Sequence, residues 1–359
     1  MCADIVVEPV VTGGALGVQI AADNVIFDGF DVTGVYGSGR YLVGDYGGPV
    51  NNWIVRNCDI HDTGHCIVPC GSNALIEYNN LHETRGDCIN GEYGNCYGIT
   101  IRHNWLHSHH TDSGSKPAGF TFNCSSTNTD PVEITYNYCW ASRTFVDFQN
   151  NGGTAPAGNI LVAHNTVDWW IGDLPSPPQA GDLAQQMSVA WWTGTANFWN
   201  GPNFEIRDNL FTRQKWYQVV VTDLQLQGQI TLENCLFDDW YLVDAYYPAY
   251  ATDFEWPGTR GAVGWDDMGA GNEFIMSGCL TGDPLYAAAG TTPDTYYALS
   301  GSGSPAYQTA TDGTNIGAWQ GIFEPTPTPT PTITPTPTVT PTSGPPTETP
   351  VPPPLPAGS

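Results

Sequence analysis

The sequence predicts an all-β solenoid, in which short parallel strands stack coil upon coil, followed by an unfolded tail. Three observations predict this fold. A segment of eight residues recurs along the chain, apolar and polar residues alternate inside it, and the composition is rich in turn-forming residues. The chain has 41 Gly and only 13% charged residues. This composition is typical of many short strands joined by tight turns.

The recurring segment places apolar residues at fixed positions. We align nine copies, which start at residues 25, 53, 74, 99, 132, 160, 204, 230 and 273. The third position is apolar in every copy: Phe27, Val55, Ile76, Ile101, Ile134, Val162, Ile206, Leu232 and Ile275. The fourth position is mostly polar. This period-two alternation predicts a strand whose odd positions face inward and whose even positions face solvent.

A short strand of this kind cannot bury its apolar face alone, so successive copies are expected to stack as coils. Equivalent positions then lie about 4.8 Å apart on neighbouring coils. At the fourth position this stacking alternates the sign of the charge, so that each coil holds the next: Asp28, Arg56, Glu77 and Arg102. The sixth position predicts a ladder of side-chain amides at a bend: Asn79, Asn104, Asn137, Asn165 and Asn209.

With this repeat the chain resembles the right-handed parallel β-helix repeat family, over roughly residues 15 to 322. That family includes polysaccharide lyases, glycoside hydrolases and noncatalytic surface proteins. The ending resembles the closing segment of many secreted bacterial members, in Asp283-Pro284-Leu285, Ser304-Pro305-Ala306 and Asn315-Ile316-Gly317-Ala318. Such solenoids usually begin with a capping element, whereas this chain opens in the middle of a coil. A missing cap or another chain segment is expected to cover that end.

The chain is expected to have two parts, a β-helix domain over residues 1–323 and a Pro/Thr-rich tail over residues 324–359. Alternating Pro and Thr favour extended polyproline II and cannot bury enough apolar surface to fold, which predicts disorder. Such a tail is typical of a spacer toward a cell wall or a further module. Ten cysteines and this tail favour a secreted or cell-surface protein, with a targeting segment expected upstream.

The charge of the chain restricts its partners. It has 36 Asp+Glu against 10 Lys+Arg, a formal net charge of −26. Nucleic acid and anionic membrane surfaces require basic patches, so neither is expected as a partner. No apolar run approaches the roughly 20 residues of a membrane-spanning helix. A polyanionic ligand would need a bridging cation such as Ca²⁺.

The cysteines leave two alternatives open. Cys66 and Cys88 occupy matching places on neighbouring coils, at a spacing within the Cα range of a disulfide. Cys70 and Cys96 are nearby alternatives for such a bridge. Inward cysteines can equally fill a core column as free thiols, as we expect for Cys139. The spacing of the cysteines does not indicate a zinc site.

The most polar part of the repeat follows the eighth position on the second to fifth coils. His61, His82 and His107 are in register there and should point outward as a stack. One interpretation is a structural ladder. The other is a surface that transfers protons, with His107 as a catalytic residue, or that binds sugar, with His82 in contact with it.

Carboxylates accompany this histidine column. Asp62 and Glu83 are also in register, which places two carboxylates about 5 Å apart. Such a pair raises one pKa or holds a cation. Together with Asp87 they could supply oxygen ligands for Ca²⁺. The alternative is a solvated acidic face in an acidic protein.

Basic residues are scarce, and Arg85, Lys116 and Arg143 fall on three successive coils. The family resemblance implies a lyase in which Lys or Arg removes the proton at C5 of a uronic acid while Ca²⁺ neutralises the carboxylate. Lys116 would be the base and Arg143 the carboxylate partner, with Arg85 beside them. An acidic surround raises the pKa of Lys116, which works against this role. The alternative is a structural role for both residues.

A glycoside hydrolase would instead need two carboxylates about 5–5.5 or 6.5–9.5 Å apart. Asp87 with Asp112, or Asp87 with Asp147, are the candidate pairs. The tandem-aspartate and His-Gly signatures of the β-helical pectin hydrolases are not recognisable in this sequence.

Tryptophans cluster after residue 165, and exposed indoles could stack on sugar rings. The candidates are Trp169, Trp170, Trp191 and Trp192. Alternatively they form a second hydrophobic layer, and adjacent tryptophans on a strand point to opposite faces. The sequence thus predicts a secreted β-helix protein that engages polysaccharide, as a Ca²⁺-assisted lyase first. A noncatalytic carbohydrate-binding or adhesive protein and a glycoside hydrolase are the alternatives.

Overall fold

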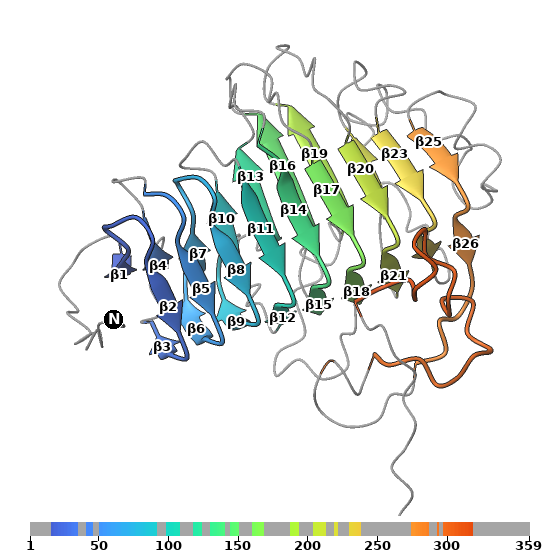
Figure 1. The fold of residues 1–359 in the computed structure, drawn as a ribbon, viewed down its shortest axis with the longest axis horizontal. Coiled ribbons are helices and arrows are strands. Elements are labelled where there is room, and N and C mark those ends of the chain that lie inside the picture. The colour runs from blue at the N-terminus through green and yellow to red at the C-terminus, as the bar shows by residue number, and fades with distance from the viewer. Residues whose placement is uncertain are drawn as a thin grey trace, which may run out of the picture. The chain divides into compact units, whose positions relative to one another are not determined.

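A computed structural model describes residues 16–34, 41–45, 50–91, 98–107, 118–123, 130–140, 144–150, 160–168, 187–193, 204–212, 219–221, 230–237, 274–286, 293 and 297–318. Its regular elements are strands (Figure 1). Within these residues no helix is long and apolar enough to cross a membrane. The chain divides into two units, Met1–Glu324 and Pro325–Ser359. The second unit holds most of the predicted tail. These residues lie outside the described ranges, so their predicted disorder stays a prediction.

The strands form three parallel sheets, which the chain visits in turn on each coil. Sheet A contains β1 (Leu16–Gln19), β4 (Tyr41–Gly44), β7 (His65–Val68), β10 (Ile89–Gly91), β13 (Ala118–Asn123), β16 (Thr144–Asn150), β19 (Met187–Thr193) and β22 (Val219–Val221). Sheet B contains β2 (Ile26–Asp28), β5 (Ile54–Arg56), β8 (Leu75–Glu77), β11 (Ile99–Arg102), β14 (Val132–Thr135), β17 (Ile160–Ala163), β20 (Phe204–Arg207), β23 (Ile230–Glu233) and β25 (Phe274–Ser277). Sheet C contains β3 (Asp31–Thr33), β6 (Asp59–Thr63), β9 (Asn80–Thr84), β12 (Trp105–His107), β15 (Tyr138–Trp140), β18 (Thr166–Asp168), β21 (Leu210–Thr212), β24 (Leu236–Phe237) and β26 (Leu280–Thr281).

The predicted fold is confirmed: the chain is an all-β parallel β-helix. Equivalent positions of the repeat pair in register from coil to coil, as Phe27 with Val55 and Val55 with Ile76 show. The third-position side chains of the first eight copies, from Phe27 to Leu232, are buried and fill the interior between the sheets. Each strand is too short to fold by itself, and stacking gives it two neighbours and a continuous apolar core.

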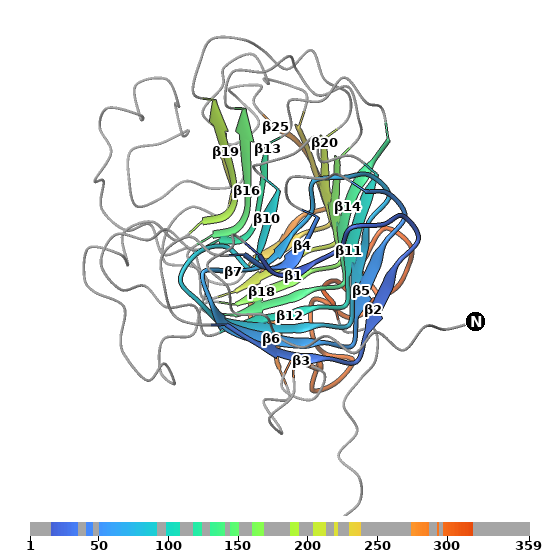
Figure 2. The same cartoon turned by 90° about the vertical axis from the view of Figure 1, so that its left-hand side faces the viewer.

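Sheets B and C meet at a sharp corner, which Figure 2 shows nearly along the coil axis. The predicted alignment of the ninth copy is wrong by one residue: Ser277 pairs with Glu233, so the positions of this copy are counted from Phe274. The fifth position of the repeat makes the corner with a left-handed backbone on nine coils: Gly29, Asn57, Tyr78, His103, Tyr136, His164, Asp208, Asn234 and Gly278. Because the corner turns the strand, inward and outward positions exchange beyond it. The prediction that even positions face solvent is therefore wrong after the corner: the sixth and eighth positions are buried, and the seventh faces outward.

The asparagine ladder is confirmed at the sixth position. Asn79 Nδ2 donates to Asn104 Oδ1 at 2.9 Å, and Asn104 Nδ2 donates to Asn137 Oδ1 at 3.0 Å. Asn137 and Asn165 continue the chain of amides at 3.0 and 2.9 Å, ending on Asn209. Each amide also donates to a backbone carbonyl of the preceding coil, such as Val55 O at 3.0 Å. The buried amides thus satisfy one another across five coils.

The charged column at the fourth position forms in part. Arg56 pairs with Asp28 at 2.8 Å, and Arg102 pairs with Glu77 at 2.8 Å, so ion pairs join neighbouring coils as predicted. Arg207 departs from this column. Its side chain pairs with Glu205 of its own strand and with Asp208 at the corner, both at 2.8 Å.

The alternative of free cysteines is the one observed. Cys66, Cys70, Cys88 and Cys139 are buried free thiols, and Cys96 lies outside the described residues. The Cys66 thiol donates to Ile60 O at 3.2 Å, and the Cys88 thiol donates to Leu81 O at 3.6 Å. These two sulfurs therefore fill the core column between sheets A and C, and no disulfide joins them.

The closing segment runs over residues 283–318, and its described part, residues 283–286, 293 and 297–318, packs on the outer face of sheet C over the later strands (Figure 1). One apolar cluster joins the sheet to the segment: Leu210, Leu236, Leu299, Ala306, Ala310 and Ile316. Gly317 allows the closest approach, since a Cβ there would lie 2.8 Å from Thr166 Oγ1 and 3.1 Å from Leu210 Cβ. Its φ of 96° also favours glycine.

Candidate functional site

The earlier strands of sheet C carry an outward face that the closing segment leaves open. We call it the histidine face and define it by the outward residues of β3, β6, β9, β12 and β15: Asp31, Asp59, His61, Asp62, Asn80, His82, Glu83, Trp105, His107 and Trp140. These side chains are half-buried or exposed. Trp105 forms the border, because it also packs against the cluster of Tyr138, Tyr297 and Ala318 under the closing segment.

The three predicted histidines stack on one another along this face. The ring centroids of His61 and His82 are 4.9 Å apart, and those of His82 and His107 are 4.8 Å apart, with nearly parallel planes. The ring centroid of Trp105 lies 4.0 Å from that of His107 in the same strand. The ring centroid of Trp140, on the next coil, lies 6.2 Å from that of His107. The result is a row of rings that rises one coil at a time.

His61 lies between two carboxylates. Its Nδ1 donates to Asp62 Oδ2 at 2.7 Å, and its Nε2 donates to Asp31 Oδ1 at 3.1 Å. Partial burial lowers the pKa of His61, but the hydrogen bonds to Asp62 and Asp31 outweigh burial and raise the pKa above its ordinary value. Two carboxylate partners favour the doubly protonated ring, so His61 is the histidine that a positive charge suits best.

Each of the other two histidines uses one ring nitrogen to bond a residue of the preceding coil. His82 Nε2 donates to Asp59 Oδ1 at 2.9 Å, and His107 Nε2 donates to Asn80 Oδ1 at 2.9 Å. Asn80 in turn donates to Asp59 Oδ1 at 3.1 Å. Every ring is therefore oriented by a carboxylate or amide, and the row has a defined pattern of donors and acceptors along the coils.

Asp62 and Glu83 lie together as predicted, with left-handed φ angles of 54° and 51°. Their carboxylates and a nitrogen of His61 are all within 4.8 Å of one another. The prediction that Asp87 completes this group is wrong, because His61 takes that place. For Ca²⁺, which prefers oxygen, this set supplies two carboxylates, and the remaining ligands would be water or hydroxyl groups. The imidazole nitrogen suits a transition metal better.

Asp87 instead lies on the outer side of sheet A in a buried hydrogen-bond network, because its partners Asn90 and Thr121 alternate with residues that face the core. Its Oδ1 accepts from the backbone N–H of Ala118 at 2.8 Å, and its Oδ2 accepts from Asn90 Nδ2 at 2.7 Å. Burial raises the pKa of Asp87 to about 6, against the lowering effect of these bonds and of one from the Thr121 side chain. A carboxyl group with this pKa can carry or release a proton near neutral pH.

The network extends to the neighbouring coils. The backbone N–H of Asp87 donates to His65 Nδ1 at 3.0 Å, and the two side chains approach to 3.7 Å. Thr121 pairs in register with Asp147 of the next strand. Asp87 and Asp147, one of the predicted carboxylate pairs, therefore belong to the coils before and after Thr121.

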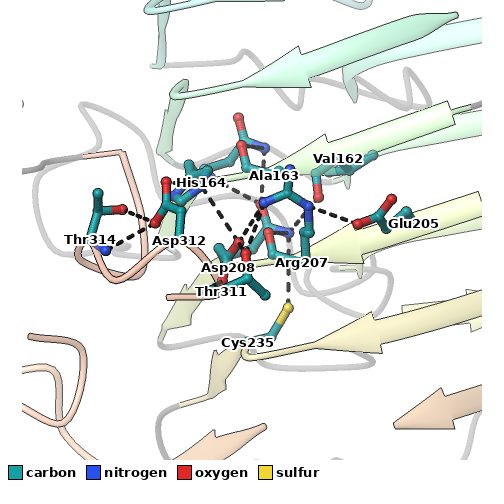
Figure 3. Close-up of polar contacts among 12 residues, drawn as sticks. Val162, Ala163, His164, Glu205, Arg207, Asp208, Cys235, Thr311, Asp312 and Thr314 are labelled. Atoms are coloured by element: carbon teal, nitrogen blue, oxygen red, sulfur yellow. Dashed lines mark hydrogen bonds and ion pairs between the residues drawn. The ribbon is translucent and has the colours of Figure 1, made fainter. Parts of the chain in front are cut away.

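A second buried polar cluster holds the closing segment at the corner of sheets B and C, as Figure 3 shows. The Asp208 carboxylate accepts from the backbone N–H of Thr311 at 2.7 Å and from its hydroxyl at 2.5 Å. His164 Nε2 lies 3.5 Å from Asp208 Oδ2 and 3.7 Å from Asp312 Oδ2. Because these residues are enclosed by the segment that they hold, we assign the cluster a structural role.

Several predicted site residues cannot be placed. Lys116, Arg143, Asp112, Trp169 and Trp170 lie outside the described residues. Trp191 and Trp192 belong to β19, where they pair in register with Phe148 and Gln149. Arg85 follows β9 directly, and its backbone N–H donates to Thr63 O at 3.0 Å.

The sequence reasoning missed Trp105 and Trp140. Trp105 occupies the seventh position of the repeat, an odd position that was expected to face inward, and the exchange at the corner turns it outward. Trp140 follows the eighth position, in register with the histidine column. A signal existed for Trp105: the same position holds Asp31, Asp59 and Asn80 on the preceding coils, residue types that seldom fill an apolar core.

The comparisons with known proteins do not name a family for this chain. No protein-family model, no curated protein and no solved structure matches it.

Proposed function

We propose that this protein binds polysaccharide outside the cell, and that the histidine face is its binding surface. One observation carries the proposal: stacked rings and oriented polar groups recur once per coil on a face that the closing segment leaves open. A polysaccharide is a chain of similar units, so a surface with one similar set of groups per coil can meet several units in succession. Sugar sites combine aromatic side chains with a few fixed donors and acceptors, and this face offers both.

Three features support a sugar as the ligand. The Trp105 side chain is half-buried, and an indole ring of this kind can pack against the C–H face of a sugar. The carboxylates of Asp31 and Asp59 are well exposed, at 79% and 47% of the side chain, and can accept from hydroxyl groups. The charge of −26 disfavours nucleic acid as a competing ligand.

The proposal includes a divalent cation for acidic polysaccharides. Asp62 and Glu83 provide two oxygen-donating groups at one end of the histidine row, close to His61. A cation there would bridge these carboxylates to a uronic acid, which the strongly acidic chain would otherwise repel. Ca²⁺ is the ion we propose, with water and sugar oxygens completing its ligands.

Affinity gel electrophoresis tests the binding proposal. The full chain is run through gels that contain a neutral or a uronic acid polysaccharide, with Ca²⁺ or with a chelator. We expect the gel to retard the wild-type protein. Trp105→Ala should weaken the affinity for the polysaccharide about tenfold and so reduce this retardation. Tyr78→Ala is the matched control, because it removes an aromatic ring that is 53% exposed outside the histidine face. Equal mobility of wild type and Trp105→Ala across the panel would reject the histidine face as the binding surface.

Hydrolysis at Asp87 is a second candidate, favoured by its pKa of about 6 and by its placement across Thr121 from Asp147. In this proposal Asp87 is the proton donor and Asp147 the second carboxylate. Release of reducing ends measures this activity, and absorbance of unsaturated uronides measures the lyase activity proposed for Lys116 and Arg143. We expect Asp87→Asn to abolish the release of reducing ends while retardation on affinity gels persists. Release that Asp87→Asn leaves unchanged would reject the role of Asp87.

A further inference from the structure

The buried column at the sixth position of the repeat ends in two cysteines. Five asparagines fill it from Asn79 to Asn209, and the next two coils place Cys235 and Cys279 there. The strands on both sides of the corner pair in register across these two coils. The two cysteines are therefore equivalent residues, one coil apart.

The two thiols take the place of ladder amides. Asn209 Nδ2 donates to a carbonyl of the preceding coil, Val162 O, at 2.7 Å. Cys235 Sγ donates in the same way to Ile206 O, and Cys279 Sγ to Leu232 O, each at 3.7 Å. The Asn209 amide also donates to Cys235 Sγ at 3.9 Å, which continues the ladder onto the first thiol. Both thiols thus occupy the ladder column on neighbouring coils.

We propose that Cys235 and Cys279 form a disulfide when the protein meets an oxidising environment. Successive coils of a parallel sheet are about 4.8 Å apart, within the 4.4–6.8 Å that separates the Cα atoms of disulfide-bonded cysteines. The spacing of the coils is therefore compatible with this bond. The disulfide would tie the last coil of sheets B and C to the one before it. This inference does not depend on the proposed function.

The reaction is thiol–disulfide exchange with a small external disulfide such as oxidised glutathione. Cys279 is half-buried whereas Cys235 is buried, so Cys279 meets the oxidant first. The hydrogen bond from Cys235 lowers the pKa of Cys279, which favours its reactive thiolate, while burial raises the pKa of Cys235.

The atoms and electrons balance in two steps. The Cys279 thiolate attacks the external disulfide, forms a mixed disulfide and releases one external thiol. Cys235 then loses its proton and attacks the Cys279 sulfur, which forms the internal bond and releases the second external thiol. The protein loses two electrons and two protons, and the external disulfide gains both.

Cys66 and Cys88 provide an internal comparison. They too lie one coil apart, but both are fully buried and each donates its thiol to a core carbonyl. Without a partly exposed member, this pair has no group for the external disulfide to meet. We expect it to stay reduced in the folded protein.

Mass spectrometry of the full chain tests the proposal. The folded protein is equilibrated in buffers of oxidised and reduced glutathione, unfolded in an alkylating agent, and digested without reduction. We expect a cross-linked peptide pair that contains Cys235 and Cys279, with Cys66 and Cys88 alkylated. Cys58→Ser, at the other end of the same column, is the matched control and should leave the cross-link unchanged.

Thermal unfolding provides a second readout. We expect the oxidised wild type to unfold at a Tm about 5 °C or more above the reduced protein, because the bond closes the loop between residues 235 and 279. Oxidation should not shift the Tm of Cys279→Ser. The wild-type experiment needs no variant to fold. Alkylation of both cysteines, a glutathione adduct that persists on Cys279, or equal Tm values in both states would overturn the proposal.

Discussion

The outer face of sheet C has two halves that share one backbone geometry and carry different side chains. On the earlier strands, the seventh position of the repeat holds Asp31, Asp59, Asn80 and Trp105, all on the histidine face. On the later strands β21, β24 and β26, the same position holds Leu210, Leu236 and Leu280. Residues 283–318 cover the later half and leave the earlier half open.

This difference separates two influences on a residue in a solenoid. The position in the coil decides the direction in which the side chain points. What lies over that position decides whether the side chain is apolar or polar. The earlier half keeps charged and aromatic groups at positions where the later half needs leucine, which is why we propose the earlier half as the binding surface.

The largest expected effect on stability comes from detaching the closing segment from sheet C. Asp208 is fully buried and accepts two hydrogen bonds from Thr311 and one from Arg207. We expect Asp208→Ala to reduce the free energy of unfolding by about 4 kcal/mol, because it leaves the Arg207 guanidinium without its buried partner. Urea unfolding measures this loss, and binding of an apolar dye reports exposure of the later half.

The control for this variant lies on the open half. Asp31 is 79% exposed and bonds His61 rather than a covering segment. Asp31→Ala should change the free energy of unfolding by less than about 1 kcal/mol. Similar losses of unfolding free energy in the two variants would show that Asp208 does not hold the closing segment in place.

Leucine and asparagine at the same repeat position give the next largest difference. We expect Leu236→Ala to cost about 3 kcal/mol, since Leu236 is fully buried between sheet C and the closing segment and leaves a cavity. Asn80→Ala, at the same repeat position on the open half, should lower the free energy of unfolding by about 1 kcal/mol or less. Urea midpoints of both variants measure the contrast. A cost for Asn80→Ala as large as that for Leu236→Ala would mean that the open half is equally enclosed.

The fold could be predicted because its signals are local and repeated. Alternation within eight residues predicted the strands, and asparagines such as Asn104 and Asn137 recurring at coil spacing predicted the ladder. The exchange of faces could not be predicted from alternation, since it depends on the left-handed backbone at residues such as Tyr78 and His103. Tyrosine rarely adopts that conformation, so a residue such as Tyr78 does not reveal it.

The site was predicted in part for a related reason. His61, His82 and Asp62 recur at coil spacing with their neighbours, so their grouping follows from the repeat. The cover and its anchor join residues more than a hundred positions apart, as Asp208 and Thr311 do. The network of Asp87 likewise depends on a bond to Ala118, outside the aligned segment. Nothing in the repeat predicts these contacts.

Acid should weaken the covered half before the open half. Burial lowers the pKa of His164, against the raising effects of Asp208 and Asp312. Arg207 also faces it, and Tyr136 stacks on it at 4.8 Å. A lowered pKa in the folded state means that the unfolded chain binds the proton more readily. The contribution of His164 to stability is therefore full above about pH 6.5 and falls as the pH drops below that value.

A comparison of wild type with His164→Gln measures this effect. Between pH 7 and 5 we expect the free energy of unfolding to fall more steeply in the wild type. The lowered pKa of Asp312 depends in part on His164, but it acts below its ordinary value of 3.8 and so outside this pH range. The raised pKa of Asp87 removes stability as the pH rises from 3.8 to about 6, and this effect is shared by the two proteins and cancels in the comparison. Parallel slopes in the two proteins would contradict the role of His164.

The smallest expected effect on stability lies in the histidine row itself. His82 stacks between His61 and His107, and its Nε2 donates to Asp59, a carboxylate that is 47% exposed. His82→Ala should therefore lower the free energy of unfolding by only about 0.5–1 kcal/mol. If the open half exists for binding, the same variant should lose most of its retardation on polysaccharide gels. A large loss of stability with unchanged retardation would contradict this proposal. The histidines would then form a structural ladder, and the histidine face would not be a binding surface.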